Sequence, residues 1–366
     1  MKYLADFRDP GLARALLAEI TASVTRPWTL MEVCGGQTHA IVRSGIDQLL
    51  PASLKLVHGP GCPVCVTPIA YIDKAVELAD QPEVIILTFG DMLRVPGSNG
   101  NLLDAKARGA DVRMVYSVLE AVELASQRPD RQIVFFGVGF ETTAPGNAMA
   151  ILQARRLGLA NFTILACHVL VPPALRALLT SPTNRVNGYL AAGHVCTVMG
   201  LADYQEIVDQ FQVPIVATGL EPVDILAGIL AAVQQLEKGE YRLENAYQRS
   251  VTPTGNSHAR EVIDQVFMVC DRIWRGIGFL PASGLAIRPE FAAFDAEQHF
   301  RLRATAEPDN GCQAGQVLQG LLVPSRCPHF GGRCKPEHPL GATMVSSEGA
   351  CAAYYRYQGV VATNEG

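Results

Sequence analysis

Short apolar runs rich in β-branched residues recur along this chain, with helical segments between them. They cover residues 30–34, 54–58, 84–89, 112–116, 133–138, 162–167, 188–191 and 214–218. Most are continuously apolar instead of alternating, which is typical of strands buried on both faces of a parallel sheet. Amphipathic segments such as 69–79 and 117–125 separate them. The pattern predicts an α/β fold with one parallel sheet near residues 20–125 and a second near 126–225.

The sequence changes character after about residue 225. Residues 223–243 and 259–274 predict helices. From about residue 276 the chain is rich in Gly, Pro and Cys, with few good strands or helices. Such a segment makes a poor core, which a bound inorganic group would help to hold together. We therefore expect α/β domains at 1–125 and 126–225, helical segments at 226–275 that pack on them, and a Cys-rich domain at 276–366.

The composition argues against several classes of protein. The longest apolar runs are far shorter than the ~20 residues that span a bilayer, and the N-terminus lacks the apolar stretch of a signal peptide. With 30 basic and 35 acidic residues the net charge is −5, which provides no positive footprint for nucleic acid. We expect a cytoplasmic protein with no membrane or nucleic-acid partner. Ten cysteines in a reducing compartment indicate metal or redox chemistry.

The segment CGGQTH, residues 34–39, follows one expected strand and precedes a helix. A thiol at a helix N-terminus has its pKa lowered by the helix dipole and free N–H groups, so we expect a reactive Cys34. The two glycines allow a ligand to approach the backbone. His39 could be a ligand, a hydrogen-bond donor or a proton carrier. The alternative is a buried cysteine at a tight turn beside a fully bonded histidine.

The segment HGPGCPVC, residues 58–65, places a CxxC pair after another strand. Cys62 and Cys65 have the spacing of thiol–disulfide oxidoreductases. A pair of metal thiolates or a structural pair is the alternative, although no second CxxC follows to complete a zinc site.

A third loop, GVGFETTAP at residues 137–145, also follows a strand. Thr142 or Thr143 would be the N-cap of the next helix, with Pro145 in its first turn. Glu141 could be an acid–base group, or it could merely favour the helix N-terminus. The loop is not GxGxxG and the chain has no GxxxxGK[ST], so the sequence supports no conventional nucleotide site.

The cysteines of the last third are widely spaced, with 14, 6 and 16 residues between Cys312, Cys327, Cys334 and Cys351. Zinc sites normally use close pairs, so single cysteines fit an iron–sulfur cluster better. Zinc or unrelated thiols are the alternatives, and His329 or His338 could replace one ligand. Several other residues are weaker candidates: core cysteines at 167, 196 and 270, and strand-end histidines at 168 and 194.

Together, CGGQTH, GPGCPVC, GFETT and the four late cysteines resemble the HypD family of hydrogenase maturation proteins, in the family's order and over nearly the whole chain. The resemblance implies two Rossmann-like domains with parallel sheets around a cleft, plus a third domain that carries a [4Fe–4S] cluster. It also implies a cytoplasmic protein that assembles the Fe(CN)₂CO unit of [NiFe] hydrogenase, together with a HypC-like chaperone and a HypE-like cyanide donor.

The resemblance further implies a role for each motif. Cys34 would hold the transient Fe(CN)₂CO iron with His39 beside it, and Cys62 and Cys65 would be a redox-active dithiol. The cleft would be lined from the second domain by Glu141, Thr142 and Thr143, and the cluster would be bound by Cys312, Cys327, Cys334 and Cys351. The leading hypothesis is thus a metallocofactor assembly scaffold with redox activity, not an enzyme of conventional turnover. A thiol–disulfide reductase that uses Cys62 and Cys65, fed by an iron–sulfur cluster, is the main alternative, and a zinc-stabilised binding protein is a third.

Overall fold

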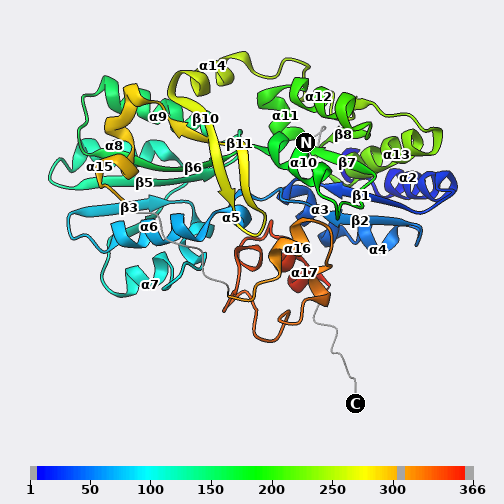
Figure 1. Cartoon of the computed structure of the whole chain (residues 1–366), viewed down its shortest axis with the longest axis horizontal. Coiled ribbons are helices and arrows are strands. Elements are labelled where there is room, and N and C mark those ends of the chain that lie inside the picture. The colour runs from blue at the N-terminus through cyan, green and yellow to red at the C-terminus, as the bar shows by residue number, and fades with distance from the viewer. Residues whose placement is uncertain (1–5, 303–309, 359–366) are drawn as a thin grey trace.

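The computed structural model describes residues 6–302 and 310–358 and contains two β-sheets that lie side by side (Figure 1). The first, sheet A, is parallel throughout, with strand order β2-β1-β7-β8-β9. Its strands are β1 (Trp28–Glu32), β2 (Leu54–His58), β7 (Gly188–Ala192), β8 (Ile215–Thr218) and β9 (Leu243–Asn245).

The second sheet, sheet B, has the order β10-β11-β6-β5-β3-β4. Four of its strands are parallel, and β11 runs antiparallel to β6 and forms a hairpin with β10. The strands are β3 (Val84–Thr88), β4 (Val112–Met114), β5 (Gln132–Gly139), β6 (Phe162–Val169), β10 (Phe267–Trp274) and β11 (Gly278–Ile287). Every residue of β3 and β6 is buried, as the continuous apolar runs predict.

The predicted division of the sheets near residue 125 is wrong. The chain forms β1 and β2, builds most of sheet B from β3 to β6, and then returns to sheet A, where β7 pairs with β1. It finally adds the β10–β11 hairpin to sheet B. Hydrophobic periodicity locates strands, but it does not say which strands pair, because pairing depends on contacts between residues distant in sequence.

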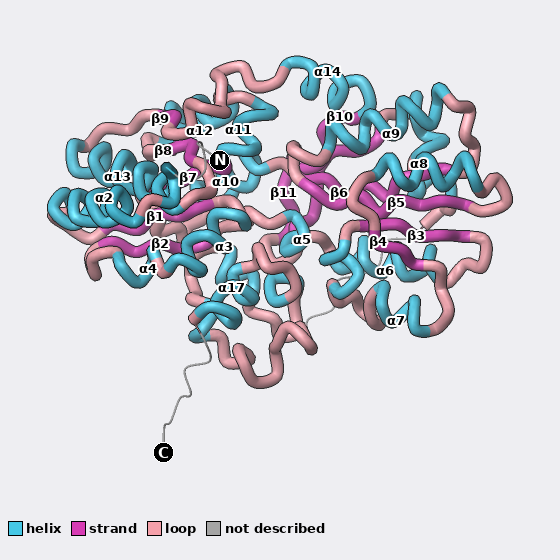
Figure 2. Tube along the Cα trace, turned by 180° about the vertical axis from the view of Figure 1, so that it is seen from behind, coloured by secondary structure: helices cyan, strands magenta, loops and turns pink. Residues whose placement is uncertain are grey.

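Helices cover both faces of sheet A (Figure 2). One face packs against α2 and α13, and the apolar cluster there includes Ile20, Leu30, Leu190 and Ile225. The other face packs against the helices between β6 and β8, around Tyr189 and Tyr204. The helices of this half are α2 (Pro10–Ser23), α3 (Gly35–Ser44), α4 (Ile46–Leu49), α10 (Val171–Thr180), α11 (Gly193–Met199), α12 (Ala202–Phe211) and α13 (Pro222–Lys238).

Sheet B has the same layered construction. Phe135 and Ile151 belong to the core beneath α8, α9 and α14, and Ile72 and Phe136 belong to the core beneath α6 and α7. The helices of this half are α5 (Pro63–Val66), α6 (Ile69–Ala79), α7 (Leu102–Ala107), α8 (Val118–Gln127), α9 (Ala144–Arg156), α14 (Ser257–Val266) and α15 (Ala296–His299). Short 3₁₀ turns occur at η1 (Asp6–Arg8), η2 (Gly90–Arg94) and η3 (Pro289–Phe294).

The predicted helix over 259–274 is half wrong. Helix α14 ends at Val266, and residues 267–274 form β10, which pairs with β11 along most of its length. The prediction that the chain forms few strands after residue 276 also fails for β11. Pairing with β6 stabilises this hairpin, and such long-range pairing overrides a marginal helical pattern.

Residues 310–358 contain little regular structure, as predicted. Their elements are α16 (Ala314–Leu318), η4 (Pro324–Arg326), η5 (Ala342–Met344) and α17 (Ala350–Tyr357), which lie below and between the sheets in Figure 1. Helix α17 packs on α3 and η5 contacts α5, so this segment covers the loops that follow β1 and β2. Within the described residues, no helix combines the length and the apolar character needed to cross a bilayer.

Candidate functional site

The candidate site lies at the carboxyl ends of β1 and β2, where two of the glycine-rich motifs meet. Cys34 is the N-cap residue of α3, and the backbone N–H of Gly35 donates to the carbonyl of Gly61 at 2.6 Å. A Cβ atom on Gly61 would overlap the backbone of Cys34. The close approach therefore requires glycine at this position, and it brings the Cys34 loop and the CxxC loop into direct contact.

The environment of Cys34 differs from the prediction of an acidic thiol. Its side chain is only 1% exposed, and this burial raises the pKa of the thiol well above its ordinary value. Backbone N–H groups of the helix N-terminus lower that pKa, but they do not offset the loss of water, and the carboxylates of Glu32 and Glu348 raise it further. Cys34 is thus a protonated thiol until a group beside it accepts its proton or a metal replaces the proton.

A histidine next to Cys34 can accept that proton. The Nδ1 atom of His194, at the start of α11, lies 3.6 Å from the Sγ atom of Cys34. Burial lowers the pKa of His194, so its ring is neutral near pH 7. The sequence could not separate His194 from His168, since both end strands. His168 has no exposed surface, bonds Asn147 at 2.9 Å and has its pKa lowered by burial to about 3.

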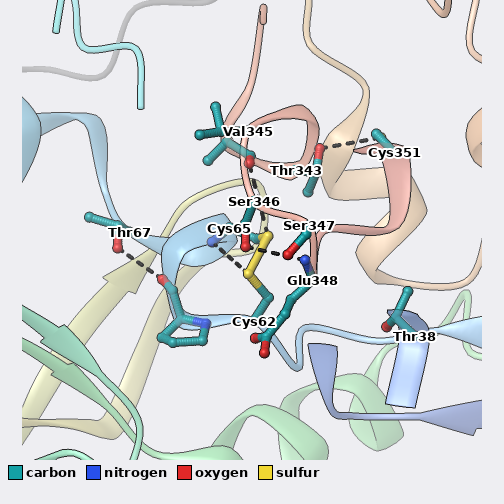
Figure 3. The surroundings of a disulfide bond; sticks show 12 residues. Thr38, Cys62, Cys65, Thr67, Thr343, Val345, Ser346, Ser347, Glu348 and Cys351 are labelled. Carbon is teal, nitrogen blue, oxygen red and sulfur yellow. Dashed lines mark hydrogen bonds between the residues drawn. A yellow bond between two sulfur atoms is a disulfide. The ribbon is translucent and has the colours of Figure 1, made fainter. Parts of the chain in front are cut away.

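Cys62 and Cys65 form a disulfide with 5.2 Å between their Cα atoms. The Sγ atom of Cys62 accepts a hydrogen bond from the backbone N–H of Cys65 at 3.3 Å. The Sγ atom of Cys65 lies 4.0 Å from the carbonyl oxygen of Ala342 in η5. Figure 3 shows the segment with Ser346 and Glu348 over this disulfide. The C-terminal third therefore forms one wall of the site.

His39 contacts that wall. Its Nδ1 atom lies 3.0 Å from the carbonyl oxygen of Ser347, and its Nε2 atom lies 3.4 Å from the hydroxyl of Tyr357. A Cβ atom on Gly35 would lie 2.7 Å from Cβ of Glu348. Through these two contacts the ring of His39 joins α3 to the C-terminal segment.

The GFETT loop follows β5 of sheet B. Glu141 is 2% exposed, and one carboxylate oxygen accepts the backbone N–H of Val171 at 2.9 Å while the other has no partner among the described residues. Burial raises the pKa of Glu141 to about 7. Thr143 is the N-cap residue of α9, as predicted, but its hydroxyl donates back to the carbonyl of Phe140 at 3.1 Å instead of capping the helix. Thr142, beside them, is half-buried.

The four late cysteines line a single cavity. Its wall is formed by α16, η5, α17 and loop residues between 327 and 340, and it includes apolar side chains such as Val317 and Met344. The thiols present are Cys312, Cys327, Cys334 and Cys351. Burial raises the pKa of the Cys351 thiol to about 12, and that of Cys312 and Cys334 also rises. Only the fold of the segment can bring such widely spaced cysteines together. Their spacing in the sequence suggested one shared site but did not establish it.

Four thiols that face one cavity are the type of ligand set that holds a [4Fe–4S] cluster. No three Cys, His, Asp or Glu side chains within residues 6–302 and 310–358 gather closely enough to hold one metal ion. Two thiols already receive hydrogen bonds, since Thr343 donates to Cys351 Sγ at 3.3 Å and the Leu340 N–H donates to Cys334 Sγ at 3.4 Å. Such donors and an apolar lining are the usual surroundings of iron–sulfur sulfurs. The donor set therefore fits a [4Fe–4S] group.

Sequence reasoning missed the carboxylate closest to Cys34. Glu32 ends β1 with no exposed surface, and its Oε2 atom accepts the backbone N–H of Cys34 at 2.8 Å. A charged residue inside an apolar strand was the available signal, because such a residue requires buried partners. Glu348 carried no comparable signal, since only the fold brings it beside Gly35.

These features define a class: an α/β protein in which a buried thiol, a disulfide and a four-cysteine cavity lie in adjoining segments. The sequence matches the HypD family, described as "Hydrogenase formation hypA family", over residues 11–358. The chain belongs to this family. It is 48% identical to the hydrogenase maturation factor HypD of Rhodobacter capsulatus, over 98% of this chain and 99% of that protein. Identity is 48% to HypD of Azotobacter vinelandii, over 98% and 97%, and 45% to HypD of Escherichia coli K12, over 98% of each chain.

Proposed function

We propose that this chain acts in hydrogenase maturation as a scaffold and redox factor for the Fe(CN)₂CO unit of [NiFe] hydrogenase. The relatives named above are hydrogenase maturation factors, and this chain matches each of them over nearly its whole length. Both facts support the general role. One observation carries the specific role: a buried thiol, Cys34, lies 3.6 Å from a neutral histidine and against the loop of a disulfide.

Cys34 holds the iron cargo in this proposal. A soft thiolate is a suitable ligand for Fe(II) that bears cyanide and carbon monoxide. When Cys34 binds iron its proton leaves, and Nδ1 of His194 is the acceptor within reach. The burial that disfavours a free thiolate thus favours a metal-bound one, because the bound cation compensates the negative charge.

The Cys62–Cys65 pair stores two electrons. Reduction of the disulfide takes two electrons and two protons, breaks the S–S bond and leaves two thiols. Because the Cys62 loop packs on the Cys34 loop through Gly61, this reservoir lies beside the proposed iron site. Transfer of cyanide from a HypE-like donor is the step that requires these electrons.

The four-cysteine cavity holds the resident cofactor in this proposal. Cys312, Cys327, Cys334 and Cys351 would bind a [4Fe–4S] cluster, which supplies single electrons when bound. Thr343 orients the Cys351 sulfur by its hydrogen bond, and the neighbouring carbonyl of Ala342 faces Cys65. Turn η5 therefore bridges the cavity and the disulfide.

A small HypC-like chaperone supplies a second iron ligand in this proposal, and the complex works in the cytoplasm. Its docking is transient, because a scaffold must release its cargo. In this proposal the cleft is lined from the side of sheet B by Glu141, Thr142 and Thr143. Glu141 has a pKa of about 7 and one carboxylate oxygen without a hydrogen-bond partner among the described residues, which suit a carboxyl that exchanges a proton near neutral pH.

Infrared spectroscopy tests the proposal directly. The protein is purified without oxygen together with its maturation partners, and bands of cyanide and carbon monoxide stretching are recorded. We expect these bands in the wild type and in Cys196→Ala, which removes another fully buried thiol of the same core. Cys34→Ala should lack them while it keeps its iron–sulfur content. Equal bands in Cys34→Ala would overturn the assignment of the ligand.

A stand-alone thiol–disulfide reductase is the second candidate. The contact of Cys65 with η5, next to the Cys351 hydrogen bond, favours it, because a reductase needs a route between its cofactor and its disulfide. Reduction of a disulfide substrate without iron cargo or partner would support this candidate. The buried Cys34–His194 pair would then have no role.

A further inference from the structure

A buried chain of hydrogen bonds links the Cys34 loop to helix α17. Glu32 accepts the backbone N–H of Cys34 through Oε2 at 2.8 Å, and its Oε1 atom lies 2.7 Å from Nδ1 of His58. The Nε2 atom of His58 lies 3.2 Å from the hydroxyl of Tyr354. Glu32, His58 and Tyr354 are respectively 0%, 3% and 5% exposed. This chain of hydrogen bonds therefore connects β1, β2 and α17 without passing through solvent.

Each member of this chain fixes the orientation of the next. A buried carboxylate is stable only among donors, and Glu32 also accepts the hydroxyl of Thr38. Because Nδ1 of His58 donates to the carboxylate, the opposite edge of the ring faces Tyr354, whose ring centroid lies 5.4 Å away. Loss of one member leaves its neighbour as a buried polar group without its partner.

Helix α17 also carries one thiol of the four-cysteine cavity. Cys351 lies in its first turn, one turn before Tyr354, and the helix packs on α3, whose N-cap is Cys34. A shift of α17 therefore acts on both sites at once. The hydrogen-bonded chain is a specific route for that coupling, in addition to the packing of the two helices.

We propose that Glu32, His58 and Tyr354 are positioning residues that hold the Cys34 loop closed and tie it to the four-cysteine segment. The inference deepens the proposed function, on which it rests in taking Cys34 as the functional thiol. With α17 in place, the hydrogen bond from Tyr354 orients the ring of His58. The ring in turn orients the carboxylate of Glu32, which binds the backbone N–H of Cys34. When α17 shifts, the hydrogen bond between Tyr354 and His58 breaks, and the Cys34 loop opens more often.

The test is the rate at which iodoacetamide alkylates Cys34 in the full-length protein, measured by mass spectrometry of the modified peptides. Cys34 is 1% exposed, so the reagent reaches it only when the loop opens. We expect His58→Phe and Tyr354→Phe, which keep the Glu32 carboxylate, each to raise the rate about ten-fold, as for loss of one buried hydrogen bond. The alkylation rate of the double variant should exceed that of either single variant by no more than about two-fold, because both changes interrupt the same chain of hydrogen bonds.

Matched controls separate positioning from general loosening. Tyr355→Phe removes a hydroxyl from the neighbouring position of α17 and should leave the Cys34 rate unchanged. The rate at Cys196, a fully buried thiol, should also stay constant in every variant, since it reports opening of the whole core. If His58→Phe does not fold, Thr38→Val takes its place, because it removes another donor to the Glu32 carboxylate.

Three results would overturn the inference. They are additive effects of the two substitutions on the Cys34 rate, a rise of the Cys196 rate together with the Cys34 rate, and a Cys34 rate equal to that of the wild type. These outcomes are distinguishable from failure of the proposed function. Alkylation requires no iron cargo or partner, whereas the proposed function fails when Cys34→Ala keeps the infrared bands.

Discussion

The Nδ1 atom of His194 lies 3.6 Å from the Sγ atom of Cys34, although the two residues are far apart in sequence and follow different strands of sheet A. Because burial raises the pKa of the thiol and lowers that of the imidazole, the pair rests as a neutral thiol beside a neutral ring. Its reactivity therefore depends on proton transfer between them.

Replacement of His194 should slow every reaction that requires the Cys34 thiolate. We expect His194→Gln to lower the alkylation rate of Cys34 at neutral pH by about ten-fold to a hundred-fold, because the nearby acceptor is lost. Site-resolved mass spectrometry measures the rate. His258→Gln, at an exposed position on α14, is the matched control and should react like the wild type. An equal rate in His194→Gln would show that another group accepts the proton.

The two sulfurs of the CxxC pair should differ in reactivity. The Cys62 sulfur accepts the backbone N–H of Cys65, which stabilises a thiolate there, whereas the Cys65 sulfur faces the carbonyl oxygen of Ala342. After reduction, Cys65→Ser should therefore form a mixed disulfide through Cys62 several-fold faster than Cys62→Ser does through Cys65. Mass mapping of the adducts gives both rates. The reverse order would assign the attacking role to Cys65.

Much of the fold was predictable because buried parallel strands have a local signature. The run over 84–89 is apolar throughout, and β3 is buried at every position. The distribution of strands between sheets was not predictable, since β1 pairs with β7 through contacts such as Leu30 with Gly188. Sequence pattern contains no local trace of such a pairing.

The candidate site was predictable where glycine and cysteine spacing reflects a geometric requirement. Gly61 packs directly on Cys34, so the two motifs had to be adjacent. The pKa of Cys34 was predicted in the wrong direction, because the helix terminus was visible in the sequence and the depth of burial was not. His194 could not be ranked above His168, since only the fold distinguishes the ring beside a thiol from the ring in a core.

Loss of one thiol from the four-cysteine cavity should destabilise the last third of the chain most. We expect Cys327→Ala and Cys334→Ala to lose bound iron and sulfide, because the apolar cluster there is too small to hold the segment by itself. Metal analysis and limited proteolysis report the two effects. Cys270→Ala, which removes a half-buried thiol on β10, should keep both properties. Full iron and sulfide in Cys327→Ala would contradict the assignment.

If the cavity holds the proposed [4Fe–4S] cluster, the hydroxyl of Thr343 should tune its reduction potential. It donates to Cys351 Sγ at 3.3 Å, and hydrogen bonds to ligating sulfurs raise cluster potentials. Thr343→Val should therefore lower the potential by on the order of tens of millivolts, while Thr343→Ser keeps it. A redox titration followed by visible absorption measures both. Equal potentials would mean that the hydroxyl turns away when the cavity is filled.

The buried carboxyl of Glu141 should make stability depend on pH in an unusual direction. Burial raises its pKa from 4.5 to about 7, so the folded protein holds a proton that the unfolded chain releases at lower pH. Stability from this group is complete below pH 4.5 and is lost as pH rises through about 7, by about 1.4 kcal/mol per pH unit within that window. Glu141→Gln, which cannot ionise, should remove this slope.

Urea unfolding of the wild type and of Glu141→Gln at several pH values between about 5 and 8 measures the difference in slope. The free energy of unfolding of the wild type should fall relative to the variant as pH rises, by up to about 3 kcal/mol across the window. The effects of other titrating groups cancel in this comparison, because the two proteins share them. Parallel curves would mean that Glu141 is already ionised in the fold, and its unpartnered oxygen would then require a bound cation or water.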